Sequence, residues 1–421
     1  MNSLELMEQS KYAMWIDRIL WILAAVLPVV IIPIDVVDIF DTIKGPILVI
    51  AGISILILLI LEKKWDNSLI SWLLLVYVFI QFLSSVFAYN PLLAFAGETA
   101  KSGRFEGLAT LIIYAILFYS AKNFMMPTQK KVIVTFSALS IVSIYALIQY
   151  YQFDPLVIYK HYRSMIFSTV GNQNFLGSLV LMLTVLALGL FLHFKKWYFA
   201  LFFSLFFSTL LVAQTRSCWL SFAVILFFIA ISVLVFNRSK WDSFLVSILL
   251  MVSITFVLNK TKKNALSTRS GTIKKEMAMK DEYGGSGRLK IWEITGIVIQ
   301  DHPFLGTGPE NLKSVIHAEH KKEINEYYRV KKTSIDKAHN EYLHIAAVTG
   351  IPSLILYLMI LSLILFQNAK HIFQANLKTL LLLTIIAYLI QAFFNISVIA
   401  VAPIYWIVLG FLSQKTKEAY L

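Results

Sequence analysis

Apolar stretches long enough to cross a lipid bilayer recur from one end of the sequence to the other. A spanning helix needs about 20 mostly apolar residues, and the 421-residue chain is 58% hydrophobic and only 14% charged. Soluble domains carry about 25% charged residues, so a soluble multidomain protein is excluded. The sequence predicts an all-α polytopic membrane protein with about 12 transmembrane helices. The expected spans are residues 15–34, 46–61, 68–87, 107–124, 131–152, 173–194, 197–214, 217–236, 241–259, 351–366, 376–395 and 397–413.

The distribution of basic residues predicts the orientation of these spans. With twelve spans both termini lie on one side, and no cleavage pattern follows the first span. Fifteen Lys and Arg residues fall on the even-numbered loops and the termini, against six on the short odd-numbered loops. Loops rich in Lys and Arg stay in the cytoplasm. We therefore expect cytoplasmic termini.

One long hydrophilic segment, which this topology places outside, divides the chain into three expected parts. Residues 1–259 form a membrane domain with spans 1–9, residues 260–350 an extracytoplasmic loop with short helices, and residues 351–421 spans 10–12 and a cytoplasmic tail. Long segments translocate regardless of their charge. Within the loop we expect helices at 288–300, at 312–330 and from Ser334 to Gly350.

Arginines from separate segments are expected at the outer face. More than four residues from their ends, the apolar spans contain no Asp, Glu, Lys or Arg, which disfavours ion-coupled transporters and proton pumps. Arginine binds phosphate oxygens bidentately, so Arg163, Arg216 and Arg288 indicate a site for a lipid phosphate or diphosphate. Arg163 could instead contact ordinary lipid headgroups. Arg216, in a short turn between two spans, could instead cap helix carbonyls.

His339 is the candidate proton acceptor, because an imidazole can take a proton from a hydroxyl near neutral pH. We expect it in the first turn of the helix that starts at Ser334. Asp336 could orient the ring or favour the helix N-terminus. An ordinary surface histidine is the alternative, since the loop carries five histidines. His344 would face about 140° away from His339 on a helix, which makes it the expected control.

Four patches occur in order along the second half of the chain. They are Gly171-Asn172-Gln173-Asn174-Phe175-Leu176-Gly177; Arg216 with Leu220; Arg288 with Trp292 and His302-Pro303-Phe304-Leu305-Gly306-Thr307-Gly308; and His339-Asn340-Glu341-Tyr342-Leu343 with Gly350. Together they resemble the O-antigen ligase and O-antigen polymerase superfamily, bacterial membrane glycosyltransferases that act on undecaprenyl-diphosphate-linked glycans. The resemblance extends from about Arg163 to the tenth span. It departs at Gln173, where the family often has Pro, and at Val348, where it often has an acid.

The resemblance implies a GT-C-like fold and a metal-independent, inverting glycosyl transfer without a cofactor. The implied partners are an undecaprenyl-diphosphate-linked glycan donor, a glycan, lipid or protein acceptor and the lipid bilayer, with no nucleic acid. The implied location is the plasma (inner) membrane, with the active site on its extracytoplasmic face. Arg216 and Arg288 would bind the diphosphate, Arg163 would assist and His339 would activate the acceptor. The other implied substrate-binding residues are Asn172, Asn174, His302, Asn340 and Tyr342.

Three other hypotheses concern a metal, the class of protein and the acceptor. Asp35, Asp38 and Asp41 could bind a divalent ion, although acids with this spacing are more often solvated. A lipid-linked oligosaccharide flippase also uses many spans and cations for diphosphate, but would place its cations within the spans and has little use for a long outer loop. A structural scaffold would give no reason for the four patches. The sequence does not separate a ligase, a polymerase and a protein O-glycosyltransferase.

Overall fold

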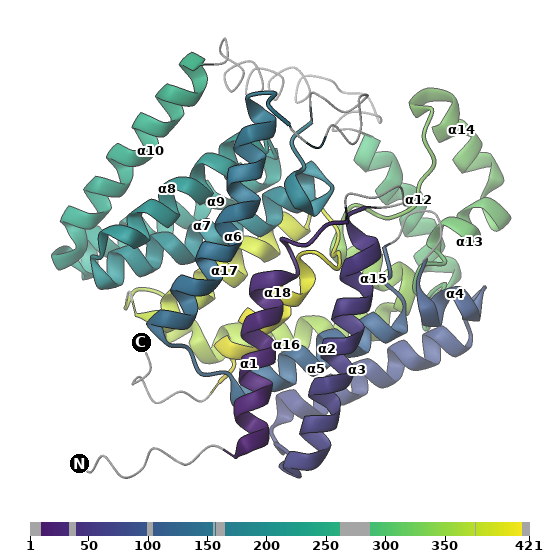
Figure 1. Ribbon diagram of the computed structural model, residues 1–421. Coiled ribbons are helices and arrows are strands. Elements are labelled where there is room, and N and C mark those ends of the chain that lie inside the picture. Colours follow the sequence, from purple (N-terminus) through teal and green to yellow (C-terminus); the bar gives the residue numbers. More distant parts are fainter. Residues whose placement is uncertain are drawn as a thin grey trace.

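The computed structural model describes residues 10–32, 39–98, 104–154, 156, 165–261, 287–374 and 376–414. Every regular element in these ranges is helical (Figure 1). Seven helical stretches are long and apolar enough to cross a membrane. They contain α2 (Asp41–Glu62), α3 (Leu69–Val86), α6 (Gln129–Tyr150), α7 (Gln173–Phe194), α9 (Arg216–Ile231) with the π-helical turn η3 (Ser232–Phe236), η4 (Arg238–Lys240) with α10 (Trp241–Thr261), and α16 (Ile351–Asn368) with η6 (Ala369–His371).

The remaining apolar helices in the described part of the chain are shorter. They are α1 (Lys11–Val26), α5 (Leu108–Phe124), α8 (Trp197–Val212), α17 (Leu377–Ala392) and α18 (Ala402–Leu412). The predicted all-helical membrane fold is confirmed in this coarse form. The count of twelve spans, the division into three parts and the orientation stay predictions.

The first expected span, residues 15–34, is too long by about two turns. Helix α1 ends at Val26, and Leu27 caps it. The next residue is Pro28, which has no backbone N–H to donate the next helical hydrogen bond. The apolar run continues after the helix has stopped, so hydropathy alone misplaces this end.

Helix α7 lies at the centre of the large hydrophobic core. Of the 18 most apolar consecutive residues of α7, 89% are buried inside the protein. The helix packs against α8, α9 and α17. In Figure 1 these helices surround α7 on the side of the molecule that also holds α6 and α10. A helix that is apolar on all faces is a buried helix. The N-terminus of α7 therefore has a fixed position against its neighbours.

Four short helices between α10 and α16 pack on a second hydrophobic cluster. They are α12 (Arg288–Asp301), α13 (Leu312–Glu319), α14 (Lys321–Lys331) and α15 (Glu341–Thr349). The cluster contains Ile291, Val298, Ile316 and Ile324. In Figure 1, α12, α13 and α14 gather at the right, beside α4 (Pro91–Ala96). The expected helix at 288–300 is confirmed.

The expected single helix at 312–330 is wrong, because the chain breaks it at His320 into α13 and α14. Ile316 and Ile324 both enter the second cluster. On one straight helix these two residues would lie about 12 Å apart along the axis. The break lets the chain fold back and bury both side chains together.

The helix expected from Ser334 is also wrong at its start. Helix α15 begins at Glu341, and the Asn340 side chain caps it by accepting from the backbone N–H groups of Tyr342 and Leu343. Asparagine is among the best N-cap residues. The residue before it, His339, has a φ of +49° and lies outside the helix. The expected end of this helix at Gly350 is confirmed.

Candidate active site

Two of the predicted catalytic arginines occupy the same position in different helices. Arg216 is the first residue of α9, and Arg288 is the first residue of α12. The N-terminus of a helix carries a partial positive charge and exposed backbone N–H groups, which favour bound anions. At both places the charge of the guanidinium adds to that of the helix. Both side chains are partly exposed.

The helices that carry these arginines meet at one place. The Arg288 guanidinium interacts electrostatically with Cys218, which lies in the first turn of α9 two residues after Arg216. The same guanidinium acts on the His339 imidazole. The Thr215 hydroxyl donates to the carbonyl of Gln173, the first residue of α7, at 3.1 Å. The Arg288 charge thus acts on groups of two other segments, the first turn of α9 and the residue before the α15 cap.

His339 lies between charged groups of both signs. Burial lowers its pKa below the ordinary value, the Asp336 carboxylate acts against this shift, and Arg288, Arg104 and Lys337 add to it. A lower pKa keeps the imidazole neutral at neutral pH, which is the form that accepts a proton. A positive φ is uncommon outside glycine, although histidine is among the residues enriched there. The unusual backbone directs the His339 side chain differently from a helical residue.

Asp336 does not serve a helix N-terminus, because α15 starts five residues later. Its carboxylate pairs with Arg104 at 2.9 Å and acts on His339 through its charge. The expectation that His344 faces away from His339 on one helix is wrong for the same reason. His344 lies on α15, interacts electrostatically with His339 and lines a small cavity.

The other predicted substrate-binding residues form contacts that define helix ends. Asn172 caps α7 by accepting from the Asn174 N–H at 2.8 Å. Asn174 accepts at its backbone carbonyl from Asn395 at 3.2 Å. His302 contacts Glu319 at 2.9 Å, which joins the end of α12 to α13. These three residues therefore have structural partners that are separate from His339.

Asn340 and Tyr342 lie next to His339 and fix the start of α15. Asn340 is buried and caps the helix. The Tyr342 hydroxyl donates to the carbonyl of Leu389 in α17 at 2.8 Å. These contacts anchor the segment that carries the imidazole to the membrane helices.

The third and fourth sequence patches hydrogen-bond to each other. Thr307 and Gly308 donate to the carbonyls of Ala347 and Val348, each at 2.9 Å, and Ile351 donates to the Pro303 carbonyl at 2.8 Å. These bonds hold the turn after α12 against the end of α15. The spacing from His339 to the end of α15 is thus part of one packed unit.

Two glycines make this close backbone packing possible. Gly350 has a φ of +89°, and a Cβ there would meet the Phe304 carbonyl oxygen at 2.0 Å. Gly306 has a φ of +65°, and a Cβ there would meet the Val348 carbonyl carbon at 2.5 Å. Only glycine accepts both the backbone conformation and the contact.

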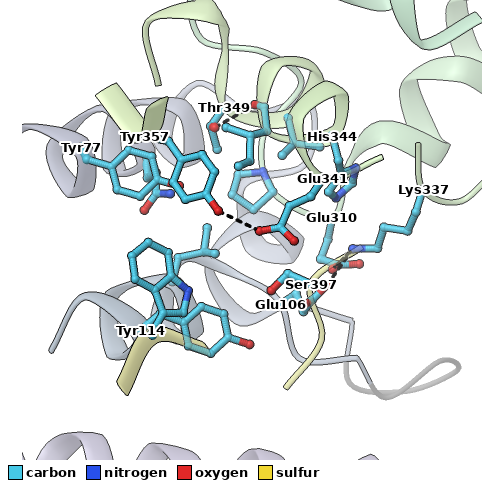
Figure 2. A pocket seen from close by; sticks show the side chains of 16 residues that line it. Tyr77, Glu106, Tyr114, Glu310, Lys337, Glu341, His344, Thr349, Tyr357 and Ser397 are labelled. Atoms are coloured by element: carbon cyan, nitrogen blue, oxygen red, sulfur yellow. Dashed lines mark hydrogen bonds and ion pairs between the residues drawn. The ribbon is translucent and has the colours of Figure 1, made fainter. Parts of the chain in front are cut away.

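A small cavity of about 70 Å³ lies at the start of α15, lined by Glu341 and His344 (Figure 2). The Glu341 carboxylate points into it and is 6% exposed. It accepts hydrogen bonds from Tyr388 at 2.9 Å and Tyr357 at 3.2 Å. Burial raises the pKa of Glu341 to about 7, against the effect of these two hydrogen bonds. Val348 lines the same cavity.

The outer end of this cavity is a buried group of opposite charges. Lys337 is 3% exposed and donates to Glu310 at 2.5 Å and to Glu106 at 3.3 Å. Burial alone would lower the pKa of Lys337, but the two carboxylates outweigh it and raise the pKa. Burial likewise raises the pKa of Glu106. A buried cation with two partners fixes the backbone immediately before His339.

Four residues around the site were not among the predicted site residues: Glu341, Lys337, Glu106 and Arg104. In the helix expected from Ser334 to Gly350, a glutamate is an ordinary helix-forming residue. Glu106 and Lys337 are more than 200 residues apart in the sequence and meet only in the folded chain. An acid two residues after the candidate base was the available signal for Glu341. For the other three residues the sequence offers none.

Some predicted residues are not brought into the site. Arg163, Asp35 and Asp38 lie outside the described residues. Asp41 starts α2, and its carboxylate lies 3.7 Å from the Lys44 ammonium. Within the described ranges, groups of three or more His, Cys, Asp or Glu side chains placed to hold a metal ion are not found. The proposal of a metal-independent reaction stays a prediction.

The fold and the site define a class: an all-helical membrane protein in which arginines begin two helices and one of them acts on a partly buried histidine. Residues 199–358 match the sequence profile of the family described as O-antigen ligase. This match confirms the resemblance to the O-antigen ligase and polymerase superfamily, and it includes Arg216, Arg288 and His339. The patch at 171–177 precedes the matched range. No curated protein matches the sequence. The family implies an enzyme of the ligase or glycosyltransferase type.

Proposed function

We propose that this protein transfers a glycan from an undecaprenyl-diphosphate-linked donor to an acceptor hydroxyl at the outer face of the plasma membrane. The observation that carries the proposal is that Arg216 and Arg288 begin α9 and α12, and that the Arg288 charge acts both on His339 and on Cys218, two residues after Arg216. It supports one site that holds an anion beside a neutral base. The family match over residues 199–358 supports the reaction type.

The two arginines bind the diphosphate of the donor in this proposal. A guanidinium stays charged at any relevant pH and presents paired N–H groups to phosphate oxygens. The N–H groups at the starts of α9 and α12 add donors of fixed direction. As the bond to the sugar breaks, negative charge grows on the diphosphate, and groups already in place stabilise it without reorganising. Arg163 assists from the outer loop.

His339 removes the proton from the acceptor. The acceptor oxygen attacks the anomeric carbon as the bond from that carbon to the diphosphate oxygen breaks. The proton moves to the neutral imidazole, and undecaprenyl diphosphate leaves with both bonding electrons. Attack from the face opposite the leaving group inverts the anomeric centre. Diphosphate leaves readily, so the reaction needs no general acid.

Purified protein, a lipid-linked glycan donor and an acceptor, without ATP, test the proposal. We expect a glycan product on the acceptor and release of undecaprenyl diphosphate. Movement of intact donor across vesicles without transfer would favour the flippase instead. EDTA should leave the rate unchanged; loss with EDTA and recovery with Mg²⁺ would contradict the metal-independent mechanism.

Reporter fusions test the side of the membrane on which the site lies. Fusions at Lys64, Lys131, Lys196 and Lys240 should report the cytoplasm, and a fusion near Glu319 should report the outside. Helix α13, which contains Glu319, is joined to α12 through His302. A cytoplasmic signal at Glu319 would therefore place the whole site on the wrong side for this reaction.

A further inference from the structure

An open cleft lies beside the chain segment that leads into His339. It has a volume of about 540 Å³, within the range of about 300–1,000 Å³ typical of small-ligand sites. Its walls come from α4, the segments around Glu98 and Arg104, α13, and the segment before His339. The lining residues are Leu93, Glu98, Arg104, Glu310, Lys313, Ser314, His317, Asp336 and Lys337. Figure 1 places α4 and α13 side by side at the right.

The charges of this cleft balance. Its lining contains three carboxylates, Glu98, Glu310 and Asp336, and three basic side chains, Arg104, Lys313 and Lys337. Arg104 pairs with Asp336 at 2.9 Å, and Lys337 pairs with Glu310 at 2.5 Å. A surface of paired charges attracts a diphosphate weakly. It offers many hydrogen-bond donors and acceptors, which suit the hydroxyl groups of an uncharged glycan.

The cleft reaches the candidate base. Asp336 and Lys337 line it, and the charges of both act on the His339 imidazole. His339 is three positions after Asp336, so their Cα atoms are at most about 11 Å apart. The Arg288 charge acts on the same imidazole. His339 is therefore under the influence of charges from the start of α12 and from the wall of the cleft.

The walls of the cleft are held in place. His317 of α13 accepts or donates at the Ser334 hydroxyl at 3.2 Å and contacts the Lys313 carbonyl at 2.8 Å. Lys337 is buried against Glu310 and Glu106. A preorganised wall lowers the entropy that a flexible ligand loses on binding. The contacts thus tie α13 to the segment that ends in His339.

We infer that this cleft binds the acceptor glycan, as an uncharged, hydroxyl-rich sugar chain, and presents one hydroxyl to His339. The inference rests on the transfer reaction proposed above and assigns the two substrates to different sites beside the imidazole. The donor diphosphate binds at Arg216 and Arg288. The acceptor binds between α4 and α13, where balanced charge disfavours a second diphosphate.

Ser314→Trp tests the inference, because Ser314 lines the cleft and an indole there fills it. Labelled undecaprenyl diphosphate serves as the donor-site probe, and glycan transfer is measured with a lipid-linked donor. We expect transfer to fall at least tenfold while undecaprenyl diphosphate binds as in the wild type. Ala318→Trp, on the same helix and exposed outside the cleft, should change neither. Full transfer in Ser314→Trp, or loss of undecaprenyl diphosphate binding, would overturn the inference.

A cysteine variant gives a second test that does not depend on a large side chain. Cys218 is the sole cysteine and is 0% exposed, so a water-soluble maleimide should label Ser314→Cys at one place. The free glycan, released from the lipid-linked donor and carrying no diphosphate, should protect Cys at 314 but not in Ala318→Cys. Protection by undecaprenyl diphosphate alone, or by neither compound, would contradict an acceptor cleft.

The two proposals fail in different ways. If the wild-type protein performs no transfer with any lipid-linked donor, the proposed function fails, and the acceptor assignment falls with it. If the wild type transfers the glycan and Ser314→Trp does so at the same rate, only the acceptor assignment fails.

Discussion

The helix starts at Arg216 and Arg288 and the cleft beside Asp336 place their cations in different settings. Arg216 and Arg288 begin helices, so that the side-chain charge and the helix N-terminus have the same sign. In the cleft, Arg104 and Lys337 are each held against carboxylates. An arginine count therefore does not locate an anion site, because the backbone and side chains around each cation also set the local potential.

The largest expected effect on the transfer rate comes from replacing His339. His339→Ala should lower the rate of the chemical step by about 10²- to 10⁴-fold, the usual share of general base catalysis. Binding of undecaprenyl diphosphate should change little, because the arginines remain. Single-turnover transfer and direct binding measurements separate the two effects. Full activity in this variant would remove the base assignment, and loss of binding would make His339 a donor ligand.

The next largest effect on transfer is expected at Arg216 and Arg288, the arginines that begin α9 and α12. Arg216→Ala and Arg288→Ala should each weaken transfer by about 10- to 1,000-fold, since a charge-assisted contact to a developing anion contributes about 1.5–4 kcal/mol. Lysine should rescue only in part, because an ammonium lacks the planar fork. Transfer rates of correctly inserted protein measure both.

Arg104→Ala is the matched comparison for Arg288→Ala. Both arginines influence His339. Arg288 is the first residue of α12, whereas Arg104 lines the cleft and contacts Asp336 at 2.9 Å. The binding of undecaprenyl diphosphate should therefore fall in Arg288→Ala and stay within about threefold of the wild type in Arg104→Ala. Equal losses of undecaprenyl diphosphate binding in both variants would contradict the distinction between the helix starts and the cleft.

A variant of Gly350 tests whether the end of α15 packs against the turn that follows α12. Gly350→Ala forces a side chain into a φ of +89° and against the Phe304 carbonyl, so we expect the protein to lose about 1–3 kcal/mol of stability. A thermal unfolding scan in detergent should show a lower midpoint. Gly296→Ala is the control, because a Cβ at Gly296 meets nothing within 4 Å and alanine favours a helix. An unchanged midpoint in Gly350→Ala would contradict the packing of α15 against the 303–308 turn.

The smallest expected effect is on the pH dependence. His339 must be neutral to accept a proton, and burial lowers its pKa. Activity should therefore be present at neutral pH and fall as the pH drops through a value below 6.5. Removing the Asp336 charge, which raises this pKa, should move the acidic limb to lower pH in Asp336→Asn.

Removing the Arg288 charge should shift the acidic limb in the opposite direction. Arg288 lowers the pKa of His339, so the residual activity of Arg288→Gln should have its acidic limb at higher pH than the wild type. The rate of single turnover against pH measures both shifts. If the acidic limbs of Asp336→Asn and Arg288→Gln move in the same direction, the two charges do not act on His339 in opposite ways.

The sequence predicted the helical class of the fold and most helix positions, because long apolar runs must satisfy their backbone groups internally in a bilayer. It erred where a local residue ends a helix before the apolar pattern does. Pro28 follows the cap of α1, and Asn340 starts α15 seven residues later than the sequence indicates. Hydropathy averages over many residues, whereas a cap is one hydrogen bond made by one side chain.

For the candidate site, the sequence by itself determined which residues have suitable chemistry: arginines for phosphate oxygens and a histidine for a proton. It also placed them in patches that match the O-antigen ligase family over residues 199–358. Only the tertiary structure decided which charges surround each one. The Lys337 ammonium reaches Glu106 across 231 residues of sequence, and Arg104 reaches Asp336. Electrostatic energy depends on distance in space and on burial, and neither quantity is written in the order of residues along the chain.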